Sequence, residues 1–174
     1  MTNGNKKLLL IGVLFVAVSV IASLFHGNYY LNTSSSVPIG LYRKEALPEK
    51  LSKGQFVLLF VPENLKQFLY SSGGFPKRWK LLKQIGGVEG DSFKIENGKF
   101  YINNKFIGNV HKTDSKGRAI PGIEPNKKQI VKSGNVLLVA TGLELSFDSR
   151  YFGEVGKENI IGIATPIFIM NDKY

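Results

Sequence analysis

The 174-residue chain is long enough for one domain with its own core, and its 43% hydrophobic content excludes wholesale disorder. Because it contains no cysteine, disulfides, cysteine-ligated metals and a cysteine nucleophile are all excluded. The 23 basic and 13 acidic residues give a net charge of +10, which predicts an anionic partner. We expect a lipid surface and no nucleic acid, because the lysines are dispersed along the chain; a basic soluble surface is the alternative.

An apolar segment without a charge, residues 8–25, follows Lys6 and Lys7. Its helix would be about 27 Å long, enough to cross a bilayer. Because the next basic residue is Arg43, the positive-inside rule predicts a cytoplasmic N-terminus and one span within residues 1–26. Residues 27–174 would then form an exported domain, on the periplasmic or extracellular side of the cytoplasmic membrane.

Two alternatives for this segment stay open. A cleavable signal peptide would also begin with basic residues, and Val20-Ile21-Ala22 resembles a cleavage site. A buried core helix is disfavoured because the segment has no polar face. We favour a retained anchor, because the apolar run exceeds the usual signal core of about 7–15 residues.

Residues 32–42, directly after the apolar segment, combine a serine cluster at positions 34–36 with Pro38 and Gly40. Proline and glycine fix the backbone shape around these hydroxyls. A nucleophile presented on a defined turn needs both features. The stretch is therefore the first candidate for a catalytic serine.

The rest of the chain has strand-length apolar runs separated by glycine, proline and asparagine, which predicts a predominantly β domain. A short helix is expected over residues 63–72, ended by Gly73-Gly74. Asn97-Gly98 and Asn103-Asn104 are typical of tight hairpin turns. Pro166 indicates an edge strand or a bulge. The expected strands cover residues 55–61, 80–85, 93–102 with its hairpin turn, 105–107, 135–140 and 160–170, and residues 111–128 are an exposed loop.

The strand over residues 80–85 contains a lysine that alternation places among apolar residues. Leu81, Lys83 and Ile85 share one face. Burial would disfavour the charged form of Lys83 and leave a neutral amine able to accept a proton. Alternation alone leaves open that the amine instead reaches solvent on its aliphatic stem.

The two histidines offer poor alternatives as a base. His26 ends the apolar segment and His111 enters the exposed loop. Together with scattered carboxylates they do not make a convincing metal site, so we expect no metal and no cofactor. If the enzyme uses a serine, a serine-lysine pair is the remaining economical arrangement.

Three blocks of sequence carry a resemblance. Residues 32–43 contain a serine two positions before proline, followed by glycine-leucine-tyrosine; residues 82–91 contain a lysine and close on Gly-Asp; residues 146–153 read Ser-Phe-Asp-Ser-Arg-Tyr-Phe-Gly. In this order they resemble the type I signal peptidase superfamily, family S26. Gly73-Gly74-Phe75 and Gly117-Arg118 resemble more closely its conjugative-transfer TraF peptidases. The resemblance implies a signal-peptidase-like antiparallel β domain behind one N-terminal transmembrane helix.

The resemblance also implies a role for each site residue. Ser36 is the nucleophile and Lys83 the general base, and the Ser34 hydroxyl joins the Ser36 backbone amide in the oxyanion hole. Ser146 orients the lysine amine. Asp148 and Arg150 resemble a supporting ion pair, and we expect it to be structural, because a carboxylate beside Lys83 would favour the charged, inactive amine.

The implied activity is that of a membrane-anchored serine endopeptidase acting, as a monomer, on a precursor protein with a signal or leader segment. For a TraF-like peptidase this precursor is a pilin subunit of a conjugative type IV secretion system. One alternative is a housekeeping signal peptidase that acts on many secreted proteins. An alternative of another class is an inactive membrane-anchored scaffold of the secretion apparatus.

Overall fold

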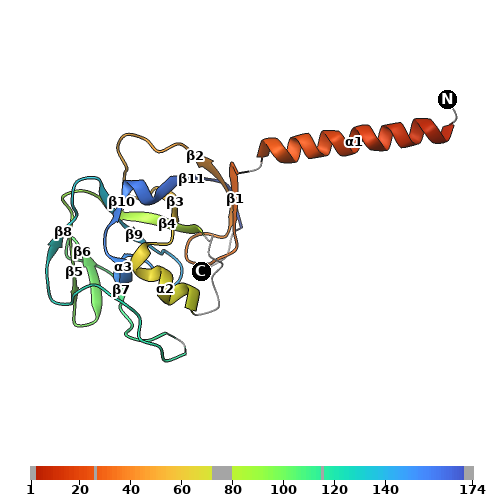
Figure 1. Cartoon of the computed structure of the whole chain (residues 1–174). Coiled ribbons are helices and arrows are strands. Elements are labelled where there is room, and N and C mark those ends of the chain that lie inside the picture. Colours follow the sequence, from red (N-terminus) through yellow and green to blue (C-terminus); the bar gives the residue numbers. More distant parts are fainter. Residues whose placement is uncertain (1–2, 26, 72–79, 115, 171–174) are drawn as a thin grey trace.

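The structure, a computed structural model, describes residues 3–25, 27–71, 80–114 and 116–170. A long helix, α1 (Asn3–Phe25), projects away from a domain built of two antiparallel sheets (Figure 1). The predominantly β antiparallel fold expected from the sequence is therefore confirmed. Gly73-Gly74, Phe75 and His26 lie outside the described residues.

Helix α1 carries large apolar side chains that stay exposed, and Leu8 and Phe15 each keep 73% of their surface accessible. Within the described ranges, no helix has both the length and the apolar character that crossing a membrane requires. The span expected within residues 8–25 therefore stays a prediction.

The larger sheet has seven strands in the order β1-β2-β11-β3-β4-β9-β10, and all neighbouring strands are antiparallel. Long-range pairing thus joins the two ends of the domain, since β11 lies between β2 and β3. The strands are β1 (Tyr29–Asn32), β2 (Gly40–Glu45), β3 (Phe56–Phe60), β4 (Lys80–Gly87), β9 (Asn135–Val139), β10 (Val155–Gly156) and β11 (Ile160–Ile169).

The smaller sheet has four strands in the order β7-β6-β5-β8. Both of its tight turns were predicted: Asn97 and Gly98 have φ angles of 51° and 71°, and Asn103 and Asn104 have φ angles of 48° and 62°. Positive φ at both central residues matches the right-handed twist of the flanking strands. The strands are β5 (Ser92–Glu96), β6 (Lys99–Ile102), β7 (Lys105–Asn109) and β8 (Gln129–Ile130).

Three short helices connect the strands. Helix α2 (Glu63–Ser71) follows β3 as the sequence predicted. Helix α3 (Ser149–Phe152) and the 3₁₀ turn η1 (Lys157–Asn159) were not predicted, because each is too short for a periodic apolar pattern.

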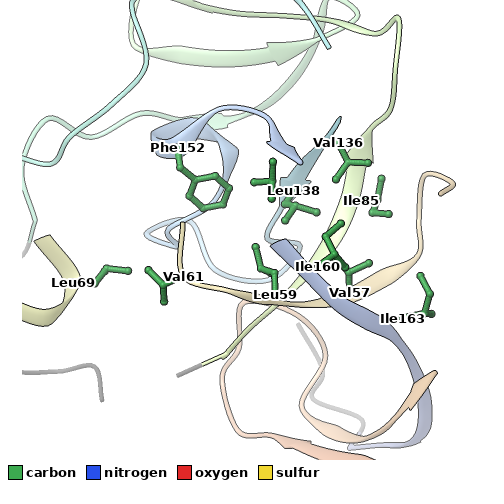
Figure 2. Close-up of a cluster of buried hydrophobic side chains, with 11 residues drawn as sticks. Val57, Leu59, Val61, Leu69, Ile85, Val136, Leu138, Phe152, Ile160 and Ile163 are labelled. Atoms are coloured by element: carbon green, nitrogen blue, oxygen red, sulfur yellow. The ribbon is translucent and has the colours of Figure 1, made fainter. Parts of the chain in front are cut away.

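Apolar clusters cover both faces of the larger sheet. Figure 2 shows the first, in which Val57 and Leu59 of β3 pack with Ile85 of β4. The intervening residue Leu58 belongs with Leu82 to a second cluster on the opposite face. Successive side chains of a strand point to opposite faces, so this alternation buries both faces of β3 and β4. A third cluster joins β9 to the smaller sheet.

Strands β1, β2, β8 and β10 were not expected, and two of the expected strands differ in detail. Strand β4 continues through Gly86 and Gly87, where the sequence predicted its end. A Cβ at Gly86 would lie 2.8 Å from a methyl group of Val139, so glycine allows β9 to approach β4 closely. Pro166 lies in β11, and the register with β2 shifts after it, so the predicted bulge is confirmed. Although β11 is an inner strand, its pairs with β3 end at Ile163, so Pro166 pairs with a neighbouring strand on one side only.

Candidate active site

The candidate nucleophile lies in the loop between β1 and β2, which is closed by the pair Asn32↔Gly40. The buried side chain of Asn32 holds this loop from within. Its amide donates hydrogen bonds to the carbonyl oxygens of Ser34 (2.8 Å), Val37 (3.1 Å) and Pro38 (3.0 Å), and its Oδ1 accepts one from the Ser34 backbone N–H (3.1 Å). The serine loop therefore has its own internal support.

Packing fixes the same loop from outside. Val37 is buried in the second apolar cluster, and the Tyr42 hydroxyl donates a 2.6 Å hydrogen bond to the Pro38 carbonyl. A Cβ at Gly40 would lie only 2.1 Å from the backbone oxygen of Phe168, so β11 requires glycine here. The conformation of this stretch therefore depends on tertiary contacts as well as on the local effects of proline and glycine.

Ser36 is 6% exposed, and its hydroxyl lies 3.0 Å from the Ser34 hydroxyl. The Ser36 backbone N–H donates to Ser34 Oγ at 3.3 Å. The Ser36 carbonyl accepts a 2.8 Å hydrogen bond from the backbone N–H of Thr141. The Ser34 hydroxyl and the Ser36 backbone N–H therefore lie next to each other in this turn.

Lys83 lies in β4, an inner strand, directly opposite Val57 of β3. It is 4% exposed, which resolves the alternative left open by alternation: the amine does not reach solvent. Burial lowers the pKa of Lys83 from its ordinary value of 10.5 to about 8. At pH 7 about a tenth of the amine is then neutral, whereas a free lysine is almost wholly charged.

The Lys83 amine donates a 2.5 Å hydrogen bond to Ser146 Oγ. Ser146 is itself buried, and 63 residues separate the two in sequence. The contact fixes the direction of an otherwise flexible side chain. Its geometry agrees with the orienting role that the resemblance implies for Ser146.

Asp148 and Arg150 form a buried ion pair with two parallel hydrogen bonds, from Nε to Oδ1 at 2.8 Å and from Nη2 to Oδ2 at 3.0 Å. Asp148 also caps α3 by accepting from the Arg150 backbone N–H, and it accepts from the Ala140 backbone N–H. Asp148 raises the pKa of Lys83 and Arg150 lowers it. Because the two charges act in opposite directions, burial dominates the pKa of Lys83, and the structural role expected for the pair stays a prediction.

One cavity of about 260 Å³ brings these groups together. Ser34, Ser36, Lys83 and Ser146 all line it, so an acyl group bound there would meet a hydroxyl and an amine. The remaining lining is largely apolar, which suits a peptide with uncharged side chains. It consists of Tyr30, Asn32, Lys80, Leu81, Leu82, Leu143, Leu145 and Phe147.

The other candidates lie elsewhere. His111, weighed above as an alternative base, does not line the cavity, and Tyr151 of the third sequence block is 2% exposed within the core. Asp91 accepts a hydrogen bond from the Val88 backbone N–H and joins the β4–β5 turn to Lys53 and Asn103, a structural role. Across the described part of the chain, no group of three or more His, Asp or Glu side chains is placed to hold a metal ion.

Sequence reasoning missed three contributors. Asn32 is the first residue of the serine stretch, but its side chain donates to three carbonyl oxygens only when the loop is folded, so its supporting role was not predicted. Leu143 and Leu145 line the cavity from an irregular segment without periodicity, so no pattern identified them.

Comparison with known proteins now adds to this geometry. The profile of the family described as "Signal peptidase, peptidase S26" matches residues 5–169. The chain belongs to this peptidase family. The match includes the serine loop, β4 and the segment containing Asp148 and Arg150, so all three blocks that carried the resemblance fall within it.

Two similar relatives are named as transfer proteins. "Plasmid transfer protein TraF" of Escherichia coli is 28% identical over 173 residues, covering 94% of this chain and 90% of the relative. "Conjugal transfer protein TraF" of Agrobacterium fabrum is 31% identical over 153 residues, covering 82% and 83%. A signal peptidase I structure from Enterococcus faecalis matches 66% of this chain and 97% of its own, with 18% identity and a TM-score of 0.40.

Proposed function

We propose that this chain is a membrane-anchored serine endopeptidase that removes the signal or leader segment of an exported precursor. The observation that carries the proposal is the shared cavity of about 260 Å³, which Ser36 and the buried Lys83 both line. Membership of the S26 family supports the peptidase activity, and the geometry supports the division of roles.

In the proposed reaction, Ser36 Oγ attacks the scissile carbonyl while neutral Lys83 accepts its proton. The lysine then donates a proton to the departing amine, which leaves an acyl-enzyme. A water molecule then loses a proton to the same amine and attacks the ester, and the lysine returns that proton to Ser36 Oγ as the carboxylic acid product leaves. Ser146 keeps the amine directed into the cavity throughout, because its hydroxyl oxygen accepts one amine hydrogen.

The developing oxyanion would be bound by the Ser36 backbone N–H and the Ser34 hydroxyl. In the resting structure this N–H donates to Ser34 Oγ, so the two donors already adjoin. Substrate binding would redirect both toward the oxyanion. Removal of one such donor in other serine peptidases lowers kcat by about 10²- to 10³-fold.

The proposed substrate is a pilin precursor of a conjugative secretion system. The names of the TraF relatives support a transfer function, and the small apolar cavity supports short side chains before the cut. An extended precursor segment would present alternate side chains to this cavity.

The proposed location is the cytoplasmic membrane, with the N-terminus inside and residues 27–174 outside. The uncharged run over residues 8–25, preceded by Lys6 and Lys7, supports this orientation. Protease added to intact spheroplasts should digest the β domain of the full chain; complete protection would contradict the orientation.

Cleavage of a matched pilin precursor by the full chain in detergent tests the activity. Ser36→Ala and Lys83→Ala should each abolish cleavage, whereas Ser35→Ala, in the same turn, should retain it. Undiminished cleavage by Ser36→Ala or Lys83→Ala would refute the dyad. Failure of the intact chain to cleave would favour an inactive scaffold, and equal cleavage of many secretory precursors would favour a housekeeping peptidase.

A further inference from the structure

One irregular segment touches both halves of the site. Residues 141–146, named here the bridging segment, begin with the Thr141 backbone N–H, which donates to the Ser36 carbonyl at 2.8 Å. They end with Ser146, whose hydroxyl accepts from the Lys83 amine at 2.5 Å. A displacement of this segment would therefore shift the nucleophile and the base relative to each other.

Packing does little to hold the bridging segment. Residues 141–145 are all exposed, and the two leucines among them, Leu143 and Leu145, keep 41% and 57% of their surface accessible. The segment also lies outside every strand and helix. Its position must therefore depend on polar contacts.

Arg150 and Asn109 provide those polar contacts. Arg150 donates from Nη1 to the Glu144 carbonyl (2.6 Å) and to the Asn109 carbonyl (3.0 Å), and from Nη2 to the Ser146 carbonyl (3.2 Å). The Asn109 side-chain amide in turn donates to the Glu144 carboxylate at 2.6 Å. Asn109 ends β7, so the smaller sheet is connected to the bridging segment.

The close approach of β7 is built into the sequence as well. A Cβ at Gly108 would lie 2.9 Å from Arg150 Nη1. Glycine there lets the β7 backbone meet the guanidinium, which brings the next residue, Asn109, to Glu144. The arrangement gives Glu144 a partner for its backbone carbonyl, Arg150, and a hydrogen-bond donor for its carboxylate, Asn109, while His111 Nε2 lies 3.9 Å from the same carboxylate oxygen.

We propose that Asn109 and Glu144 are positioning residues that hold the bridging segment, and with it Ser36 and Ser146, in register with Lys83. The smaller sheet thus contributes to the reaction through β7, although no strand of that sheet carries a residue of the proposed dyad. This inference rests on the proposed function of Ser36 and Lys83. It assigns the pair no contact with the substrate.

The test replaces this hydrogen bond by a repulsion. Asn109→Asp preserves shape but sets two carboxylates against each other, so kcat should fall by about tenfold or more while KM changes little. Glu144→Gln alone should retain activity because its amide oxygen still accepts from Asn109. The double variant Asn109→Asp/Glu144→Gln should restore kcat, because the glutamine amide then donates to the aspartate.

A matched control lies in the same sheet. The Asn103 side-chain amide donates to the Asp91 carboxylate at 2.6 Å, far in sequence from the bridging segment. Asn103→Asp likewise sets a carboxylate beside Asp91, although the pairing of Asp91 with Lys53 moderates the repulsion. It should lower the melting temperature while leaving kcat unchanged. An equal loss of kcat in both variants, or no rescue by the double variant, would overturn the positioning role.

A second readout does not require catalysis. Chymotrypsin should cut after Leu143 or Leu145 faster in Asn109→Asp than in the unaltered chain, and the double variant should return to the original rate. Unchanged nicking would contradict the inference even if cleavage of the precursor is observed. Failure of the unaltered chain to cleave a precursor would instead refute the proposed function, which this proteolysis does not measure.

Discussion

The serine loop and the lysine strand reach the same cavity by different means. Around Ser36, most of the supporting hydrogen bonds are local, because the Asn32 side chain donates to carbonyls two, five and six residues further along. The exception is the hydrogen bond from the Thr141 backbone N–H to the Ser36 carbonyl. Around Lys83, the support is distant in sequence, from β3, β9 and Ser146. The backbone conformation that presents a nucleophilic serine can be encoded largely in a few adjacent residues. The lowered pKa of the lysine amine comes from burial, which requires the whole sheet.

The largest effect is expected from a substitution of Lys83 in β4, which should change the cleavage rate and the free energy of unfolding in opposite directions. Lys83→Met, which nearly conserves volume, should lower cleavage by at least about 10³-fold. At neutral pH it should nevertheless stabilise the fold by up to about 3 kcal/mol, because it removes a buried group whose pKa is lowered to about 8. Urea unfolding monitored beside the cleavage assay measures both.

The sign of this stability effect depends on pH. Between about pH 8 and 10.5 the unfolded chain binds more protons at Lys83 than the folded chain, so stability should rise with pH in that window. The advantage of Lys83→Met should accordingly disappear near pH 10.5. A constant advantage across this window would contradict burial as the cause.

At the serine loop, the next largest effect is expected from Ser34→Ala. If its hydroxyl binds the oxyanion, kcat should fall by about 10²- to 10³-fold with little change in KM. Steady-state kinetics on the precursor would measure this, with Ser35→Ala as the control. Equal kcat values for the two variants would reduce Ser34 to a turn residue.

Asn32→Ala probes the local support itself. It removes the donor to the Ser34 and Val37 carbonyls and should lower the free energy of unfolding by about 1–3 kcal/mol, and kcat by about 10- to 100-fold. Because Lys83 is held independently, the pH midpoint of the remaining activity should stay near 8. A shifted midpoint would show that the two regions are coupled more tightly than their contacts indicate.

The smallest expected effect is the change in kcat/KM per unit of pH. The base must be neutral, so kcat/KM should rise about tenfold per pH unit up to about pH 8, the pKa of Lys83, and then level off. A rate profile between pH 6 and 10 measures this. Activity that rises only near 10.4, the value for a free lysine, would contradict the desolvated base.

Much of the fold was predictable because its signals are local. The hairpin turns at Asn97-Gly98 and Asn103-Asn104 need only residues that tolerate positive φ, and the apolar runs marked β3, β9 and β11. Strands β1 and β2 were missed, because the serine stretch between them masked their short alternating patterns. The end of β4 was predicted too early, because two consecutive glycines usually indicate the end of a strand. In this fold Gly86 and Gly87 continue β4 and allow β9 to pack closely against it.

By itself, the sequence determined which residue types are available: a serine on a shaped turn, a lysine among apolar neighbours, and no cysteine. These depend on order along the chain and on alternation, which are local properties. Only the tertiary structure decided that Lys83 is 4% exposed, that Ser146 accepts from its amine, and that Asn109 meets Glu144. Desolvation and hydrogen bonding across 35 to 63 residues arise when the sheets pack, so no single stretch could have revealed them.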